Sequence, residues 1–195
     1  VNSDGSIGTW TNTTPLPAAR AVGGAAAYNG KMYYWGGWGP VGSYTTRNTC
    51  YYADINPDGS IGTWTTSTVT IPDSDDPQGS DTSVPYPYPQ MDAFGRGIMM
   101  FGDTLYIING ENNYGTNQDE CYYSKLTTGG DYGTWTETTN TPAGTADPGS
   151  WFHGVATYAG TSANYIYRVG ANFSGTYEVQ SLKAVINTDG SLGAW

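Results

Sequence analysis

One heptapeptide, Asp-Gly-Ser-Ile-Gly-Thr-Trp, recurs along this chain and constrains its fold more than any other feature. It stands at 4–10 and 58–64, returns with two changes at 189–195, and is shortened at 130–135. The tryptophans that close the four copies lie 54, 71 and 60 residues apart. Recurrence at intervals of this size is the signature of a repeat architecture, in which each interval is one supersecondary unit.

The intervals between these tryptophans share a second pattern. Each opens with a short apolar segment, at 22–28, 97–101 and 154–158. A tight Asn-Gly or Gly-Asp turn and an aromatic segment ending on glycine follow, which predicts a β-hairpin. In this pattern 28–37 aligns with 101–110, and 158–170 is a third copy with three extra residues in its turn.

A third strand precedes each tryptophan by fourteen residues, at 50–55, 121–126 and, more loosely, 181–186. An Asp-Gly turn then leads into a fourth strand that carries the tryptophan, and no segment sustains a helical period. The chain is therefore predicted to be all-β, with three four-stranded antiparallel units and a spare N-terminal copy of the fourth strand. The expected parts of this single repeat domain, 1–195, are a leading strand at 1–14 and units at 15–67, 68–138 and 139–195.

The first unit resembles a kelch repeat. The resemblance rests on Gly36-Gly37 closing the second strand, Tyr51 in the third strand, Trp64 in the fourth strand, and the Leu-Pro-Ala-Ala-Arg entry at 16–20. The heptapeptide itself resembles a kelch subtype of bacterial cell-surface proteins. The later units have Asn109-Gly110 and Val169-Gly170 in place of the glycine pair. The resemblance implies blades of a β-propeller, and we expect three tryptophans to pack in the core: Trp10, Trp64 and Trp135.

Three units are fewer than the four to eight blades of ordinary propellers. The chain is therefore expected to belong to a larger ring or assembly, in one of three ways. It is a piece of a longer propeller, two copies form a six-bladed ring, or the spare strand completes a blade of a neighbouring copy by strand addition. The expected partners are other copies of the chain or further blades.

The loops before the first strand and after the second strand of each unit meet at one end of the blades. Their length varies most, with 37 residues from Trp64 to Phe101 against 18 from Trp10 to Tyr28. Exposed rings beside amides and carboxylates suit protein contact or sugar binding, and they also suit loops that only cover the sheet edges. The predicted binding residues are Trp38, Tyr44, Tyr86, Tyr88, Glu111, Asn112, Tyr114, Trp151, His153 and Phe173.

Four aspartates in the long loop could offer oxygen ligands to Ca²⁺, but they lack the spacing of a calcium loop. A solvated acidic loop is the favoured interpretation of Asp73, Asp75, Asp76 and Asp81, and no metal or cofactor is expected. The single histidine, His153, excludes a site built on several imidazoles of one chain. No nucleophile elbow or phosphate loop is present, although paired carboxylates remain possible. Cys50 and Cys121 occupy equivalent positions and are predicted to be buried free thiols.

Composition limits the partners and the compartment. The formal net charge of -10 disfavours nucleic acid, and no apolar run is long enough for a membrane helix. Only 12% of residues are charged, and a surface rich in Thr, Ser and Asn is typical of secreted proteins. The expected function is a non-catalytic, extracellular structural or self-assembly module of a surface layer, fibre or appendage. The alternatives are a carbohydrate-binding or adhesive face, and a fragment of a glycoside-processing enzyme.

Overall fold

The computed structural model describes residues 3–20, 23–39, 45–46, 48–71, 97–111, 117–142, 154–173 and 176–195. All regular structure in these ranges is β-strand, so none of them holds a helix that could cross a membrane. The strands are β1 (Gly24–Tyr28), β2 (Lys31–Trp35), β3 (Trp38–Gly39), β4 (Thr45–Thr46), β5 (Cys50–Asp54), β6 (Thr65–Thr66), β7 (Gly97–Phe101), β8 (Thr104–Glu111), β9 (Asn117–Lys125), β10 (Trp135–Thr138), β11 (Gly154–Ala159), β12 (Asn164–Phe173) and β13 (Thr176–Ile186).

The strands form three main antiparallel sheets in which chain neighbours are also spatial neighbours. The first sheet has the order β1-β2-β5-β6, the second β7-β8-β9-β10, and the third β11-β12-β13, while β3 and β4 form a small separate ribbon. The predicted all-β fold and the order of strands in the first two units are confirmed. The third sheet has three strands where four were predicted. The fourth strands of the first two sheets begin at or just after the repeated tryptophan, at Thr65 and Trp135, whereas in the third unit that tryptophan, Trp195, is the last residue of the sequence.

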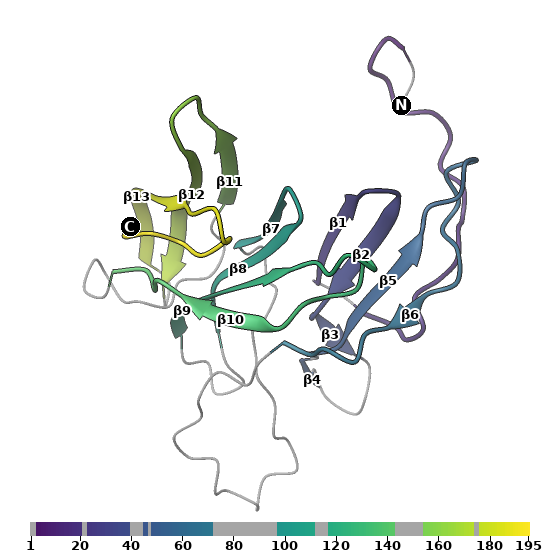
Figure 1. The fold of residues 1–195 in the computed structure, drawn as a ribbon, viewed down its shortest axis with the longest axis horizontal. Coiled ribbons are helices and arrows are strands. Elements are labelled where there is room, and N and C mark those ends of the chain that lie inside the picture. The colour runs from purple at the N-terminus through teal and green to yellow at the C-terminus, as the bar shows by residue number, and fades with distance from the viewer. Residues whose placement is uncertain are drawn as a thin grey trace, which may run out of the picture.

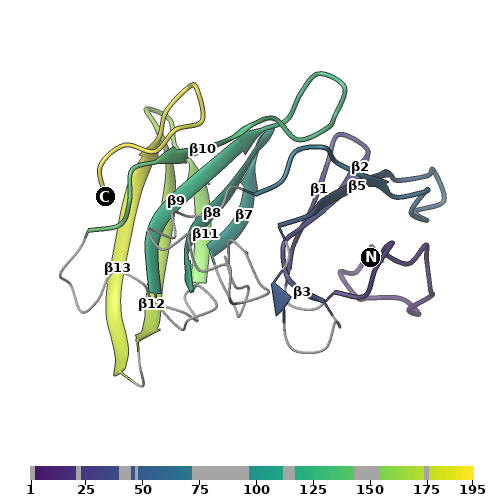
Figure 2. The same ribbon diagram turned by 90° about the horizontal axis from the view of Figure 1, so that it is seen from below.

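The three sheets lie side by side in chain order, as Figures 1 and 2 show. Their opening strands are in contact in series, β1 with β7 and β7 with β11. A core cluster fills each of the two junctions between sheets, and burial of these apolar side chains is the main force that holds neighbouring sheets together. The first junction includes Tyr33, Trp35, Cys50, Leu105 and Ile107, and the second includes Tyr106, Ile108, Cys121, Ile166, Ala184, Ile186 and Leu192.

A β-bulge near the end of the second strand shows which residues of the second and third units are equivalent. The register shifts at Asn109 in β8 and at Gly170 in β12, and both residues have positive φ, 58° and 62°. Gly170 is therefore equivalent to Asn109 and not to Gly110, so the turn of the third unit holds four extra residues where the sequence predicted three. Because a slip of one residue exchanges the faces of a strand, this alignment decides which side chains of β12 face outward.

The prediction of core tryptophans is confirmed for Trp135 and wrong for Trp10, and the prediction of a leading strand is wrong. Of the three tryptophans expected in the core, Trp135 is buried, whereas Trp64 is half-buried and Trp10 is 86% exposed. The described part of the leading segment, residues 3–14, contains no strand. The exposure of Trp10 and the missing leading strand have the same cause. A fourth strand pairs with the third strand of its own sheet and is covered by neighbouring sheets, and the described residues before β1 form no sheet with which the leading segment could pair.

Candidate functional site

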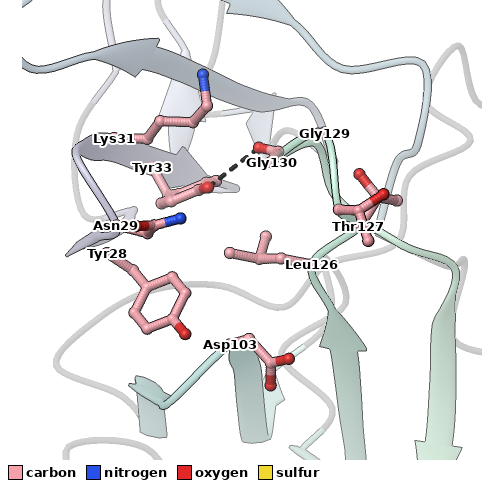
Figure 3. Close-up of a pocket in the computed structure, with 10 residues that line it drawn as sticks. Tyr28, Asn29, Lys31, Tyr33, Asp103, Leu126, Thr127, Gly129 and Gly130 are labelled. Carbon is pink, nitrogen blue, oxygen red and sulfur yellow. Dashed lines mark hydrogen bonds between the residues drawn. The ribbon is translucent and has the colours of Figure 1, made fainter.

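The two junctions between sheets are built from the same contact, a tyrosine of the second strand that reaches the Asp-Gly turn of the next sheet. The Tyr33 hydroxyl donates a hydrogen bond to the carbonyl oxygen of Gly130 at 3.0 Å (Figure 3). The Tyr106 hydroxyl donates to the carbonyl oxygen of Gly190 at 2.8 Å. Tyr33 and Tyr106 are both almost fully buried. Burial raises the pKa of the Tyr33 hydroxyl to about 12 and also raises the pKa of Tyr106, so both groups stay protonated donors.

The turn glycines differ in how they are covered. Atoms of Lys31 lie within 3 Å of where a Cβ on Gly130 would stand, and Thr104 and Tyr123 crowd the same place at Gly190. A Cβ on Gly59, at the equivalent place in the first sheet, would have no atom of the described residues within 4 Å. The turn of each later sheet is therefore covered by the sheet before it, while the turn of the first sheet is open.

A second contact joins the end of one fourth strand to the heptapeptide of the next sheet. Between the second and third sheets, the Leu192 amide donates to the Thr138 hydroxyl oxygen at 2.6 Å, and the Thr139 hydroxyl donates to the Leu192 carbonyl at 2.7 Å. The Trp195 indole then donates to the Thr139 carbonyl at 2.8 Å. Two adjacent threonines, three and four residues after a tryptophan, thus bind the backbone amide and the backbone carbonyl of one residue, Leu192, in the next repeat.

The N-terminal segment makes the same contact on the first sheet. The Ile61 amide donates to the Thr13 hydroxyl oxygen at 2.7 Å, the Thr14 hydroxyl donates to the Ile61 carbonyl, and the Trp64 indole donates to the Thr14 carbonyl at 3.1 Å. Thr13 and Thr14 follow Trp10 at the same spacing at which Thr138 and Thr139 follow Trp135. The segment therefore lies where the fourth strand of a preceding sheet would end.

At the junction between the first and second sheets, a buried tyrosine side chain, Tyr132, stands in place of this threonine contact, and we call it the tyrosine plug. Tyr132 stands where the other repeats have Ile or Leu, and its hydroxyl lies 3.1 Å from the carbonyl oxygens of both Tyr34 and Tyr51. Its ring meets Tyr33 edge-on, with centroids 5.7 Å apart, and stacks on Trp135 at 6.4 Å. Burial raises the pKa of Tyr132, so the hydroxyl remains a neutral donor inside the junction.

A shallow crevice opens at the turn end of each junction. The first, of about 240 Å³, lies between the turn after β1 and the Thr127–Gly130 turn of the second sheet (Figure 3). The second, of about 150 Å³, lies at the equivalent place between the second and third sheets. Among the described residues that line the first crevice, Asp103 is the one carboxylate, and these residues assemble neither a paired acid and base nor a metal ligand set. The crevices are seams between packed sheets.

The predicted binding face falls largely outside the described residues. Three of its residues lie in described strands: Trp38 in β3, Glu111 at the end of β8 and Phe173 at the end of β12. Glu111 and Phe173 lie at the same end of their sheets, as expected for the loop that follows each second strand. Tyr44, Tyr86, Tyr88, Asn112, Tyr114, Trp151 and His153 lie outside the described residues, as do Asp73, Asp75, Asp76 and Asp81.

The cysteine prediction is confirmed. Cys50 and Cys121 are free thiols with no exposed surface, one in each junction cluster. Burial raises the pKa of the Cys50 thiol to about 12, so it is neutral and serves as a small apolar group. Across the described ranges no three His, Cys, Asp or Glu side chains gather as a metal site.

The junction tyrosines and threonines were not among the predicted site residues. The signal for the tyrosines was present, since Tyr33 and Tyr106 coincide when the second strands are aligned. The signal for the threonines was their fixed distance after the repeated tryptophan. Neither pattern indicates which neighbouring sheet the side chain contacts, because that contact depends on how the sheets pack in the tertiary structure. Comparison with models of known protein families and with curated proteins finds no match for this chain.

Proposed function

We propose that this chain is a non-catalytic structural module, built from kelch-like propeller blades, that assembles through contacts between sheets of like chains. The observation that carries the proposal is the docking of Thr13 and Thr14 on Ile61. It reproduces the docking of Thr138 and Thr139 on Leu192, so the N-terminal segment takes on the first sheet the position in which the fourth strand of a preceding sheet would end. A module whose first sheet is already prepared for a preceding sheet is suited to addition in series.

The proposed setting is extracellular, in a surface layer, fibre or appendage. Supporting this setting, the chain carries only seven Lys and Arg and 12% charged residues, and its polar surface is supplied by Thr, Ser, Asn and Gly. The function requires no cofactor, because sheet-to-sheet contacts alone are the binding chemistry.

Sedimentation velocity over a wide range of chain concentrations tests the proposal, with negative-stain imaging of the same samples. We expect the sedimentation coefficient to rise with concentration as copies add, and rings or linear arrays to appear in the images. A single monomeric species at every concentration would overturn the proposal.

A further inference from the structure

The third sheet repeats on its outward face the features by which the first two sheets bind their successors. Strand pairing makes Tyr167 equivalent to Tyr106, since Tyr167 lies opposite Lys183 in β13 and Tyr106 lies opposite Tyr123 in β9. Those two partners stand at the same distance before their tryptophans. Tyr167 is thus the counterpart of the tyrosines that donate to the turn glycine of a following sheet, yet it is only half-buried.

The glycines that open the three first strands show the same difference. Gly24 and Gly97 are buried, and a Cβ on Gly24 would stand 2.1 Å from the Ile98 side chain of the second sheet. Gly154 holds the equivalent place in the third sheet, but it is exposed, and among the described residues a Cβ there would meet only the Val169 carbonyl oxygen, at 3.8 Å. Val169 is itself 51% exposed, whereas its counterparts in the first two sheets are fully buried.

The first sheet presents the complementary half on its own outward face. Ala25, whose counterpart Ile98 packs on Gly24, is exposed. Gly59 stands exposed in its turn, whereas the equivalent residues Gly130 and Gly190 each accept a tyrosine hydroxyl with the carbonyl oxygen. The chain therefore carries both halves of a third junction, one at each end of its array of sheets.

We infer that the third sheet of one copy docks against the first sheet of a second copy, with Tyr167 donating to the Gly59 carbonyl and Gly154 receiving Ala25. This inference rests on the proposed self-assembly and names its contact. The docking brings residues 11–14 of the second copy beside β13, in the place that β10 holds beside β9, and so supplies the fourth strand that the third sheet lacks. In the docked pair, Trp195 of the first copy takes the repeat position that Trp10 of the second copy would otherwise occupy. The 86% exposure of Trp10 is consistent with this displacement.

The contact is head-to-tail, because the two copies contribute different surfaces. Such an interface closes into a ring or continues as an open array, according to the rotation between copies. It also predicts that two variants damaged on opposite halves can still join, since one undamaged third sheet then meets one undamaged first sheet.

The test uses two variants of the whole chain, Gly154→Val on the third sheet and Ala25→Arg on the first. Each is expected to remain monomeric alone, and a mixture of the two is expected to give a complex of twice the chain mass in light scattering. Tyr167→Phe should weaken association of the otherwise unchanged chain about tenfold. Tyr158→Phe is the matched control, because Tyr158 is exposed and the second sheet has Phe101 at its place.

The results separate the two proposals. A wild-type chain that never associates overturns both. A wild-type chain that associates while Gly154→Val and Ala25→Arg associate equally well overturns the named contact and leaves self-assembly standing. Two monomeric variants that fail to join when mixed overturn the head-to-tail arrangement. Circular dichroism checks that each variant is folded, and Val169→Arg on the same face replaces Gly154→Val if that variant is not.

Discussion

The Tyr106 hydroxyl and the Gly190 carbonyl, 84 residues apart in sequence, are joined by a 2.8 Å hydrogen bond that ties the second sheet to the third. Tyr106 has no exposed surface, and Gly190 is buried beneath Thr104 and Tyr123. Single hydroxyl groups at repeated positions therefore add to the apolar burial that holds the junctions together.

Tyr106→Phe is expected to lower the free energy of unfolding by about 1–3 kcal/mol, because it leaves the buried Gly190 carbonyl without its donor. Urea denaturation followed by tryptophan fluorescence measures the change. Tyr28→Phe is the control, since Tyr28 is partly exposed and the second sheet has Phe101 at its place. Equal losses in the two variants would contradict a special role for the Tyr106 hydroxyl.

Gly24→Ala is expected to destabilise the chain by about 1–3 kcal/mol through overpacking. The new methyl group would overlap the Ile98 side chain and the Trp35 ring, at 2.1 and 2.6 Å. Gly154→Ala is the matched variant at the equivalent place of the third sheet, where the nearest atom is 3.8 Å away. At a concentration low enough to keep the chain monomeric, the thermal midpoint of Gly154→Ala should stay within a degree or two of wild type, and a similar loss in both variants would rule out this account of the first junction.

Tyr132→Phe and Tyr132→Leu separate the two contributions of the plug. The Phe variant keeps the ring contacts with Tyr33 and Trp135 but loses the hydroxyl shared by two carbonyls, at an expected cost of about 1–3 kcal/mol. The Leu variant, which carries the residue of the last repeat, also leaves a cavity and should cost more. Denaturant titration ranks the variants, and a Leu variant as stable as wild type would show that the plug can be dispensed with.

Alkaline pH is expected to destabilise the fold. The folded chain holds the Cys50 thiol and the Tyr33 hydroxyl at pKa values of about 12, raised from 9.0 and 10.0 by burial. The unfolded chain releases these protons first, so stability is fully present below about pH 9 and is lost as pH rises towards 12. Urea midpoints measured across this range test the slope.

The Tyr33→Phe variant serves as the control for this pH dependence. It should be less stable at neutral pH, because the hydrogen bond to Gly130 is lost, and its stability should fall less steeply above pH 9. A free energy of unfolding that stays constant up to pH 12 would contradict the raised pKa values.

Thr13→Val is expected to release the N-terminal segment without unfolding the sheets. The Ile61 amide loses its acceptor, so its hydrogen exchange should speed up while the global unfolding midpoint barely changes. Thr138→Val removes the same acceptor from the buried Leu192 amide and should lower global stability as well. If Ile61 exchange is unaffected by Thr13→Val, the segment is not held by this contact.

The amino-acid sequence alone specifies the unit of this fold. Recurrent Asp-Gly turns, aromatic second strands and spaced tryptophans predicted four antiparallel strands in order, and the first two sheets have that order because hairpin turns and strand alternation are local properties. It also predicted the buried thiols, since Cys50 and Cys121 hold one position within the repeat. It misplaced Gly170 by one residue, because a bulge can be located only from the pairing partner.

Packing between sheets sets which of the repeated residues are buried. Trp10 and Trp135 end similar segments, yet the first is 86% exposed and the second 5%. Gly59 and Gly190 occupy the same turn position, yet only Gly190 has a sheet over it. Local sequence is nearly the same in each pair, so burial depends on whether a neighbouring sheet is present to exclude water. The repeat specifies the surface that each sheet offers, and only the arrangement of sheets decides whether that surface becomes a core or stays open for a partner.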